Sequence, residues 1–144
     1  MECVLFIGIQ GSGKSTFYKE QFFHTHVRIN LDMLKTRNRE DLYLAASYQS
    51  KQKFVVDNTN LTKEVRKKYV ALSKQFNYKV IGYIMDSDID SCLERNNRRE
   101  GKQKVPPEVI RSALKKLQIP TFEEGFDELF HVKNENKQFV ITKI

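Results

Sequence analysis

The sequence predicts an α/β fold in which helices cover both faces of a mainly parallel β-sheet. Two observations support this prediction. Short apolar runs alternate along the chain with longer helical stretches, and a glycine-rich turn joins the first run to the first helix. With 144 residues, of which 40% are hydrophobic, the chain can bury one core but has little material for a second. We therefore expect a single domain over residues 1–144 with about five strands.

The first half of the chain supplies three of the expected strands. These strands cover residues 4–7, 27–30 and 54–56. Helices are expected between them over residues 16–23 and 32–50. The third strand ends at Asp57, and Thr62 is a good N-cap for the helix that follows, with Glu64 in its first turn.

In the second half, four apolar residues recur at helical spacing after Thr62 and should face the sheet. They are Val65, Tyr69, Leu72 and Phe76. The remaining expected elements are a strand over 78–85, a helix over 89–97, a helix from Pro106-Pro107 to before Pro120, and a strand pair over 130–132 and 139–141. A turn near residues 134–136 would join that pair.

The glycine-rich turn at residues 8–15 reads G-x-x-x-x-G-K-S, the complete pattern of a phosphate-binding loop. Its glycines let backbone N–H groups surround a polyphosphate, and the helix that follows adds its positive N-terminal end. Lys14 would reach the β- and γ-phosphates, and Ser15 would offer its hydroxyl to Mg²⁺. The pattern and its setting between strand and helix indicate a protein that binds a nucleoside triphosphate.

The rest of the chain separates the classes of protein that share this loop. A G-protein switch needs an N-K-x-D base reader, and the stretch 136–139 lacks the aspartate. A motor-type ATPase usually has a water-activating glutamate after its strand-end aspartate, but here Asn58 follows Asp57. A small kinase needs a carboxylate beside the acceptor hydroxyl and an arginine-rich lid over the phosphates, and both have candidates in this sequence.

Asp32, just past the second strand, is the candidate base, because the carboxyl ends of parallel strands line the ligand crevice. The alternative, equally open at this point, is that Asp32 only caps the next helix. The lid candidate is about residues 95–105, with Arg95, Arg98 and Arg99 and a permissive Gly101. A guanidinium group can clamp phosphoryl oxygens in a way that a lysine cannot.

These parts together resemble the 5′-kinase domain of polynucleotide kinases, the DNA and RNA end-healing enzymes of the P-loop kinase superfamily. The resemblance runs nearly the full length and includes the segments 11–17, 29–32, 57–60, 96–98 and 120–126. It implies a P-loop kinase fold with a lid segment, ATP as phosphate donor, Mg²⁺ as cofactor, and single-stranded or end-frayed DNA or RNA 5′ ends as partners.

The resemblance also implies roles for particular residues. The catalytic ones are Lys14, Asp32 and Arg99. The nucleotide-binding ones are Gly11, Ser12, Gly13, Lys14, Ser15, Thr16, Arg95 and Arg99, with Ser15 and Asp32 at the metal. The substrate-binding ones are Lys35, Arg37, Asp57 and Asn60. The family usually has an arginine where this chain has Leu31. A few residues after the base, its members often carry another arginine that grips the acceptor phosphate, and here Lys35 or Arg37 would have to serve.

Many family members also carry a 3′-phosphatase, which needs an Asp-x-Asp-Gly-Thr motif that this sequence lacks. We therefore expect a kinase without a phosphatase domain, with a separate phosphatase or ligase as a possible partner. The sequence does not decide the oligomeric state, the preference for DNA or RNA as acceptor, or the preference for ATP or GTP as phosphate donor.

The net charge of +7 suits a polyanionic partner but serves plain solubility equally well. The segment from Thr62 to Lys79 contains six basic residues and one acidic residue. It would form either a surface that binds nucleic acid or a solvated helix face. Two cysteines without metal-type spacing, no signal peptide and no long apolar run predict a cytoplasmic protein free of membranes, with the nucleus also open.

The sequence therefore predicts a polynucleotide 5′-hydroxyl kinase that uses ATP. Two alternatives remain: a kinase of a small hydroxylated molecule, such as a nucleotide sugar or an antibiotic, and a non-catalytic ATP-binding module.

Overall fold

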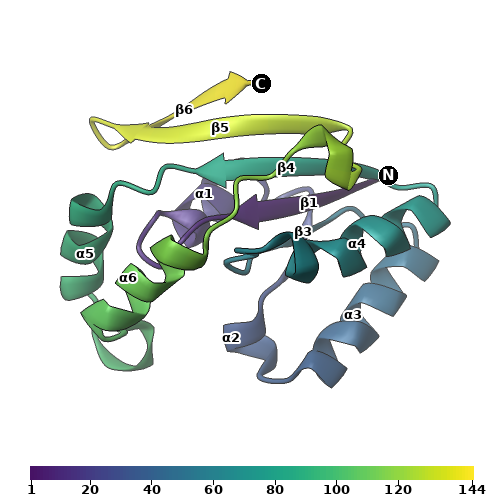
Figure 1. The fold of residues 1–144 in the computed structure, drawn as a ribbon. Helices are drawn as coiled ribbons and strands as arrows, with labels where there is room; N and C mark the ends of the chain where they lie inside the picture. The colour runs from purple at the N-terminus through teal and green to yellow at the C-terminus, as the bar shows by residue number, and fades with distance from the viewer.

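The computed structural model describes residues 1–144 and contains one six-stranded sheet with helices on both faces (Figure 1). The strand order is β2-β3-β1-β4-β5-β6, and every neighbouring pair is parallel except β5 with β6. The strands are β1 Glu2–Ile7, β2 Val27–Ile29, β3 Phe54–Val56, β4 Lys79–Met85, β5 Glu128–Glu135 and β6 Gln138–Lys143.

The helices fall between these strands as the alternating pattern predicts. They are α1 Lys14–Gln21, α2 Leu31–Leu34, α3 Arg37–Gln49, α4 Lys63–Gln75, α5 Ile89–Asn97 and α6 Pro107–Lys116. Two short 3₁₀ helices complete the fold, η1 Gly101–Gln103 and η2 Phe122–Glu124. The α/β class and the mainly parallel sheet are confirmed, and the six strands match the six expected segments, against an approximate total of five.

The strand pair expected near the C-terminus forms a longer hairpin, β5 and β6, beside β4. Asn136 and Lys137 form its turn, both at positive φ (50° and 63°). This backbone geometry matches the twist of a two-residue hairpin, and asparagine tolerates it better than most residues.

The single helix expected over 32–50 is two helices. Asn30 caps α2 by accepting a hydrogen bond from the Met33 N–H, and Thr36 caps α3 in the same way. Between them Lys35 adopts φ 74°, which ends the helical path. The sequence did not reveal this break because no glycine or proline marks it.

Three apolar clusters hold the layers together. On one face of the sheet, Leu44 and Tyr48 of α3 and Tyr69 of α4 pack against β1 and β3. On the other face, Phe17 and Phe22 of α1 pack against β1 and β4. A smaller cluster joins α5 and α6 to the end of β1. No helix combines the length and the apolar character needed to cross a lipid bilayer.

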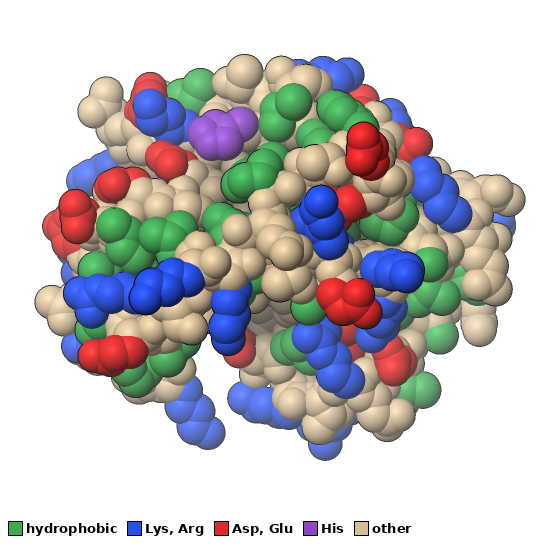
Figure 2. Space-filling model, viewed as in Figure 1, with side chains coloured by type: hydrophobic (Ala, Val, Ile, Leu, Met, Phe, Trp, Pro, Cys, Tyr) green, Lys and Arg blue, Asp and Glu red, His purple; other side chains and the backbone are tan.

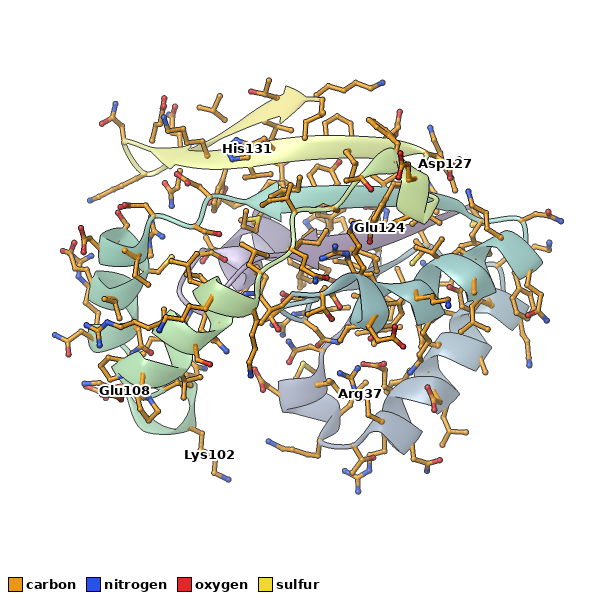
Figure 3. The ribbon with its side chains drawn as sticks, viewed as in Figure 1. Arg37, Lys102, Glu108, Glu124, Asp127 and His131 are labelled. Carbon is orange, nitrogen blue, oxygen red and sulfur yellow. The ribbon has the colours of Figure 1, made fainter.

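The buried face of α4 differs from the expected one. Val65, expected to face the sheet, is 37% exposed, whereas Arg66 is fully buried beside Tyr69. The Arg66 guanidinium donates to both Glu124 carboxylate oxygens (2.8 and 3.1 Å) and to the Asn60 carbonyl oxygen (2.9 Å). This ion pair ties α4 to η2, where Figure 3 labels Glu124.

Glu124→Ala should lower the free energy of unfolding by about 3 kcal/mol, because it leaves the buried Arg66 cation without its anion. Chemical denaturation of the variant and the parent measures this loss. Glu123→Ala, an exposed neighbour in the same 3₁₀ helix, is the matched control and should change stability by less than about 0.5 kcal/mol. Equal effects of the two substitutions would contradict the assigned role of the ion pair.

Candidate active site

The phosphate-binding loop connects β1 to α1 at the carboxyl end of the sheet. Gly11 and Gly13 adopt φ 81° and 95°, a backbone region that other residues rarely enter. A Cβ on Gly11 would also lie 2.4 Å from the carbonyl oxygen of Cys92 in α5. The loop therefore needs glycine at this position both for its turn and for the close approach of α5.

Lys14 lies folded into its own loop. Its ammonium group donates to the carbonyl oxygens of Gly8 and Ile9, both at 2.9 Å. Burial of the ammonium lowers the pKa of Lys14 to about 8, and Arg99 acts in the same direction, while Asp57 and Asp32 raise it. Residues far apart in the sequence thus act on the electrostatics of one lysine.

Arg28 of β2, which the sequence analysis did not single out, bridges two predicted site residues. It donates from Nε to the Asp57 carboxylate (2.8 Å) and from a terminal nitrogen to the Ser15 hydroxyl (3.0 Å). The Asp57 side chain is only 1% exposed, so its charge needs this partner. Arg28 is a charged residue in the middle of a short strand, and this position was the signal in the sequence that could have pointed to a role for it.

The contacts of Arg28 with Ser15 and Asp57 indicate where a metal could bind. The Ser15 hydroxyl and the Asp57 carboxylate share a cation, the guanidinium of Arg28, and hydroxyl and carboxylate oxygens are ligands that Mg²⁺ accepts. The protein has no group of three or more His, Cys, Asp or Glu side chains able to hold a metal alone. This arrangement fits Mg²⁺ held by one or two protein groups together with phosphates.

Asp32 is the second residue of α2 and is exposed. Its carboxylate makes no hydrogen bond or ion pair within the protein, and it lies near enough to Lys14 to raise the pKa of that lysine. Because Asn30 caps α2, the alternative in which Asp32 serves only as a cap does not hold. The Asp32 carboxylate is therefore available to a ligand.

The predicted acceptor residues do not gather into one group. Lys35 is exposed at the end of α2, whereas Arg37 donates to Glu40 (3.2 Å) and to the Tyr69 hydroxyl (3.1 Å). Asn60 needs a correction, because it is buried and its amide donates to backbone carbonyl oxygens at the ends of β1 and β3. Asn60 therefore shapes the loop after β3 rather than contacting an acceptor.

The predicted lid begins in α5, beside the phosphate loop. Arg95 donates to the Gly11 carbonyl oxygen (2.9 Å). Asn96 is buried and exchanges two hydrogen bonds with the backbone of Val105 (2.7 and 3.0 Å), so both ends of the intervening loop are fixed. In the space-filling view, the part of the molecule formed by α5, α6 and this loop is separated by a hollow from the part formed by α2 and α3 (Figure 2).

A cavity of about 440 Å³ opens on the outer side of the phosphate loop. Gly13 and Thr16 form one wall, Arg95 of α5 and Arg98 just after that helix another, and Asn134 of β5 a third. Guanidinium planes and side-chain amides at the start of α1 can hold a flat polar group next to a bound polyphosphate. The sequence analysis assigned no role to the hairpin residues because they are distant in sequence from any motif.

The cations between residues 62 and 79 do not form an open basic face. Arg66 is buried, and Lys68, Lys74 and Lys79 pair with acids on α3 or near β5. Of the six, only Lys63 and Lys67 have no acidic partner. Figure 2 shows acidic and basic side chains interspersed over the visible surface. The solvated-face interpretation of this segment is the one that the structure favours.

Comparison with known proteins identifies the family. The family model described as an AAA domain matches residues 3–120. The chain belongs to this family. A solved sugar kinase from Janibacter sp. HTCC2649 has the same fold, with a TM-score of 0.69 at 15% identity over 92% of this chain and 85% of that one. The domain is thus a P-loop kinase domain in fold.

Two curated relatives are polynucleotide kinases by name. The bifunctional polynucleotide phosphatase/kinase of Schizosaccharomyces pombe is 30% identical over 91% of this chain and 33% of its own length. A candidate bifunctional polynucleotide kinase/RNA ligase of Autographa californica nuclear polyhedrosis virus is 28% identical over 85% of this chain and 22% of its own length. The resemblance to polynucleotide kinases is confirmed, and the P-loop kinase domain spans a third or less of these relatives.

The lowered pKa of Lys14 predicts that nucleotide binding takes up a proton near pH 8. In the free domain the ammonium group loses its proton around this pH, and a bound polyphosphate would raise its pKa again. ADP affinity should therefore fall as pH rises above 8, by up to tenfold per unit. Isothermal titration between pH 7 and 9.5, in buffers of different ionisation enthalpy, measures both effects. Lys14→Met should abolish the proton uptake, and uptake that persists in this variant would refute the assignment.

Proposed function

We propose that this domain transfers the γ-phosphate of ATP to the 5′-hydroxyl of a DNA or RNA end. The free carboxylate of Asp32, on the same edge of the sheet as the phosphate loop, is the observation that carries the proposal. The two curated relatives named as polynucleotide kinases support the choice of acceptor.

In this reaction Asp32 accepts the proton of the attacking hydroxyl as the bond to phosphorus forms. Lys14 turns from the carbonyl oxygens of its own loop to the β- and γ-phosphates, and Arg99, which acts electrostatically on Lys14, offsets charge on the transferred group. Arg95 and Arg98 flank the cavity that would receive the base of ATP. Lys35, the exposed cation nearest to Asp32 along the chain, would contact the acceptor strand.

Ser15 and Asp57 would hold Mg²⁺, with Asp32 on the acceptor side. The metal would neutralise phosphate charge and orient the β- and γ-phosphates. Arg28 must then release the Ser15 hydroxyl and the Asp57 carboxylate, since it donates hydrogen bonds to both.

A second candidate function is phosphorylation of a small hydroxylated molecule. One observation favours it, because the solved sugar kinase shares the fold over 92% of this chain. The commitment of Arg37 to Glu40 and Tyr69 also leaves few cations for an acceptor backbone. The non-catalytic alternative gives no role to the unpaired Asp32 carboxylate.

Transfer of labelled γ-phosphate from ATP to a 5′-hydroxyl oligonucleotide, as DNA and as RNA, tests the proposal. Asp32→Asn should lower kcat by roughly 10²–10⁴-fold, the usual contribution of a general base, and leave the ADP Kd within about twofold. Asp41→Asn, at an exposed carboxylate on α3, is the matched control and should change neither value. ATP binding without transfer to oligonucleotides would favour the small-molecule kinase.

Arg28→Gln should strengthen the dependence of nucleotide binding on Mg²⁺. Without the Arg28 guanidinium, the Asp57 carboxylate has no cation paired with it inside the protein. Mg²⁺ then no longer competes with an arginine for this carboxylate. The ratio of ADP Kd values measured without and with Mg²⁺ should rise about tenfold, close to the value of one charge-assisted hydrogen bond. Arg111→Gln, at an exposed arginine on α6, serves as control. Equal ratios in all three proteins would show that Arg28 does not compete with the metal.

A further inference from the structure

Glu40 of α3 is a fully buried carboxylate for which neither the sequence motifs nor the proposed reaction gives a role. Burying a carboxylate is costly unless other groups compensate its charge. One oxygen, Oε1, accepts hydrogen bonds from the Tyr69 hydroxyl (2.8 Å), Lys68 (3.1 Å) and Arg37 (3.2 Å). Two cations and a hydroxyl group therefore surround Glu40 and compensate the charge of its carboxylate.

The other oxygen, Oε2, accepts a hydrogen bond from the side-chain amide of Asn58 (3.1 Å). The carbonyl oxygen of the same amide accepts the backbone N–H of Leu31 (2.9 Å). An ionised carboxylate can only accept and a backbone N–H can only donate, so these two partners leave one orientation for the Asn58 amide. Glu40 thus fixes the orientation in which Asn58 can hold Leu31.

Leu31 is the first residue of α2 and Asp32 is the second. The helix has four residues, so its own hydrogen bonds cannot keep it in place. Besides Asn58, the anchor at its start is Asn30, whose amide donates to the Asp57 carbonyl oxygen (2.5 Å) and accepts the Met33 N–H (3.1 Å). The backbone position of Asp32 depends on these two asparagines.

We infer that Glu40 is a positioning residue that acts through Asn58 and Leu31 to set the place of the Asp32 carboxylate. The inference rests on the proposed role of Asp32 as the base. Glu40 is buried and contacts no ligand-facing group of the phosphate loop, so it takes no part in the chemistry itself.

Glu40→Gln tests this relay, the chain of hydrogen bonds from Glu40 through Asn58 to Leu31. The glutamine amide can point an N–H group toward Asn58, and the Asn58 amide is then no longer held in one orientation. Hydrogen exchange of the Leu31 amide, followed by NMR, should become at least tenfold faster than in the parent. Asp41→Asn is the matched control, since Asp41 also pairs with Lys68 but has no contact with Asn58. Unchanged exchange in Glu40→Gln would overturn the relay.

The effect on Asp32 is measured by phosphate transfer. Glu40→Gln should lower kcat by roughly 10–100-fold, the scale of a misplacement of about 1 Å, with the ADP Kd within about twofold. In the Asp32→Asn background, the same substitution should have no further effect on kcat, because there is no base left to position. Independent, multiplying effects would overturn the inference.

Two outcomes separate this inference from the proposed function. If Asp32→Asn abolishes transfer while Glu40→Gln leaves kcat unchanged, the proposed function stands and the positioning role fails. If Asp32→Asn leaves transfer unchanged, both fail. Should Glu40→Gln not fold, Asn58→Ala, which removes the middle of the relay, carries the same exchange and kinetic measurements with the same criteria.

Discussion

The parallel arrangement of β1 to β5 is the constraint on which the candidate site depends, because it brings their carboxyl ends to one edge of the sheet. At that edge β1 leads into the phosphate loop, β2 into Asn30 and α2, and β3 into Asp57. Arg28 of β2 contacts both the Asp57 carboxylate, just after the neighbouring strand β3, and the Ser15 hydroxyl, which follows β1 on the far side of β3. The site follows from strand order more than from sequence proximity.

On the nucleotide side of this edge, the charged side chains have their hydrogen-bond partners within the protein. Lys14 donates to carbonyl oxygens of its own loop, and Asp57 pairs with Arg28. Burying charged groups is costly unless such partners compensate them. A bound polyphosphate with its metal would offer new partners to the same groups, so binding would exchange internal contacts for external ones. The lowered pKa of Lys14 is the measurable consequence of burying its ammonium group in the loop.

Local patterns in the sequence sufficed to predict the phosphate loop, the alternation of strands and helices, the cap at Thr62 and the start of α6 at Pro106-Pro107. These features depend on residues within a few positions of one another. Arg66 was assigned to a surface because hydropathy alone places an arginine in water. Its burial depends on Glu124, which lies 58 positions further along the chain.

The same reason explains what was missed at the site. Arg28 contacts Asp57 and Glu40 contacts Asn58, and no local pattern connects them to these two residues of the loop after β3. The pairing of β2 with β3 brings Arg28 to Asp57, and the packing of α3 beside these strands brings Glu40 to Asn58. Long-range contacts of this kind leave no periodic signal, so they become visible only once the fold is known.

The acceptor side is built on a different principle from the nucleotide side. There, two asparagine amides fix one turn of helix, and Lys35 is held at φ 74°, a conformation that costs energy for a residue with a side chain. Arg37 is exposed but paired with Glu40, so the unpaired cation at the end of α2 is Lys35, which binds phosphate as a point charge without a fixed fork. In the proposed reaction, selection of a 5′ end would then depend on where α2 places Asp32 rather than on a firm grip of the acceptor phosphate. That dependence makes the anchoring of α2 by Asn58 and Glu40 the feature of this site with the greatest consequence for its chemistry.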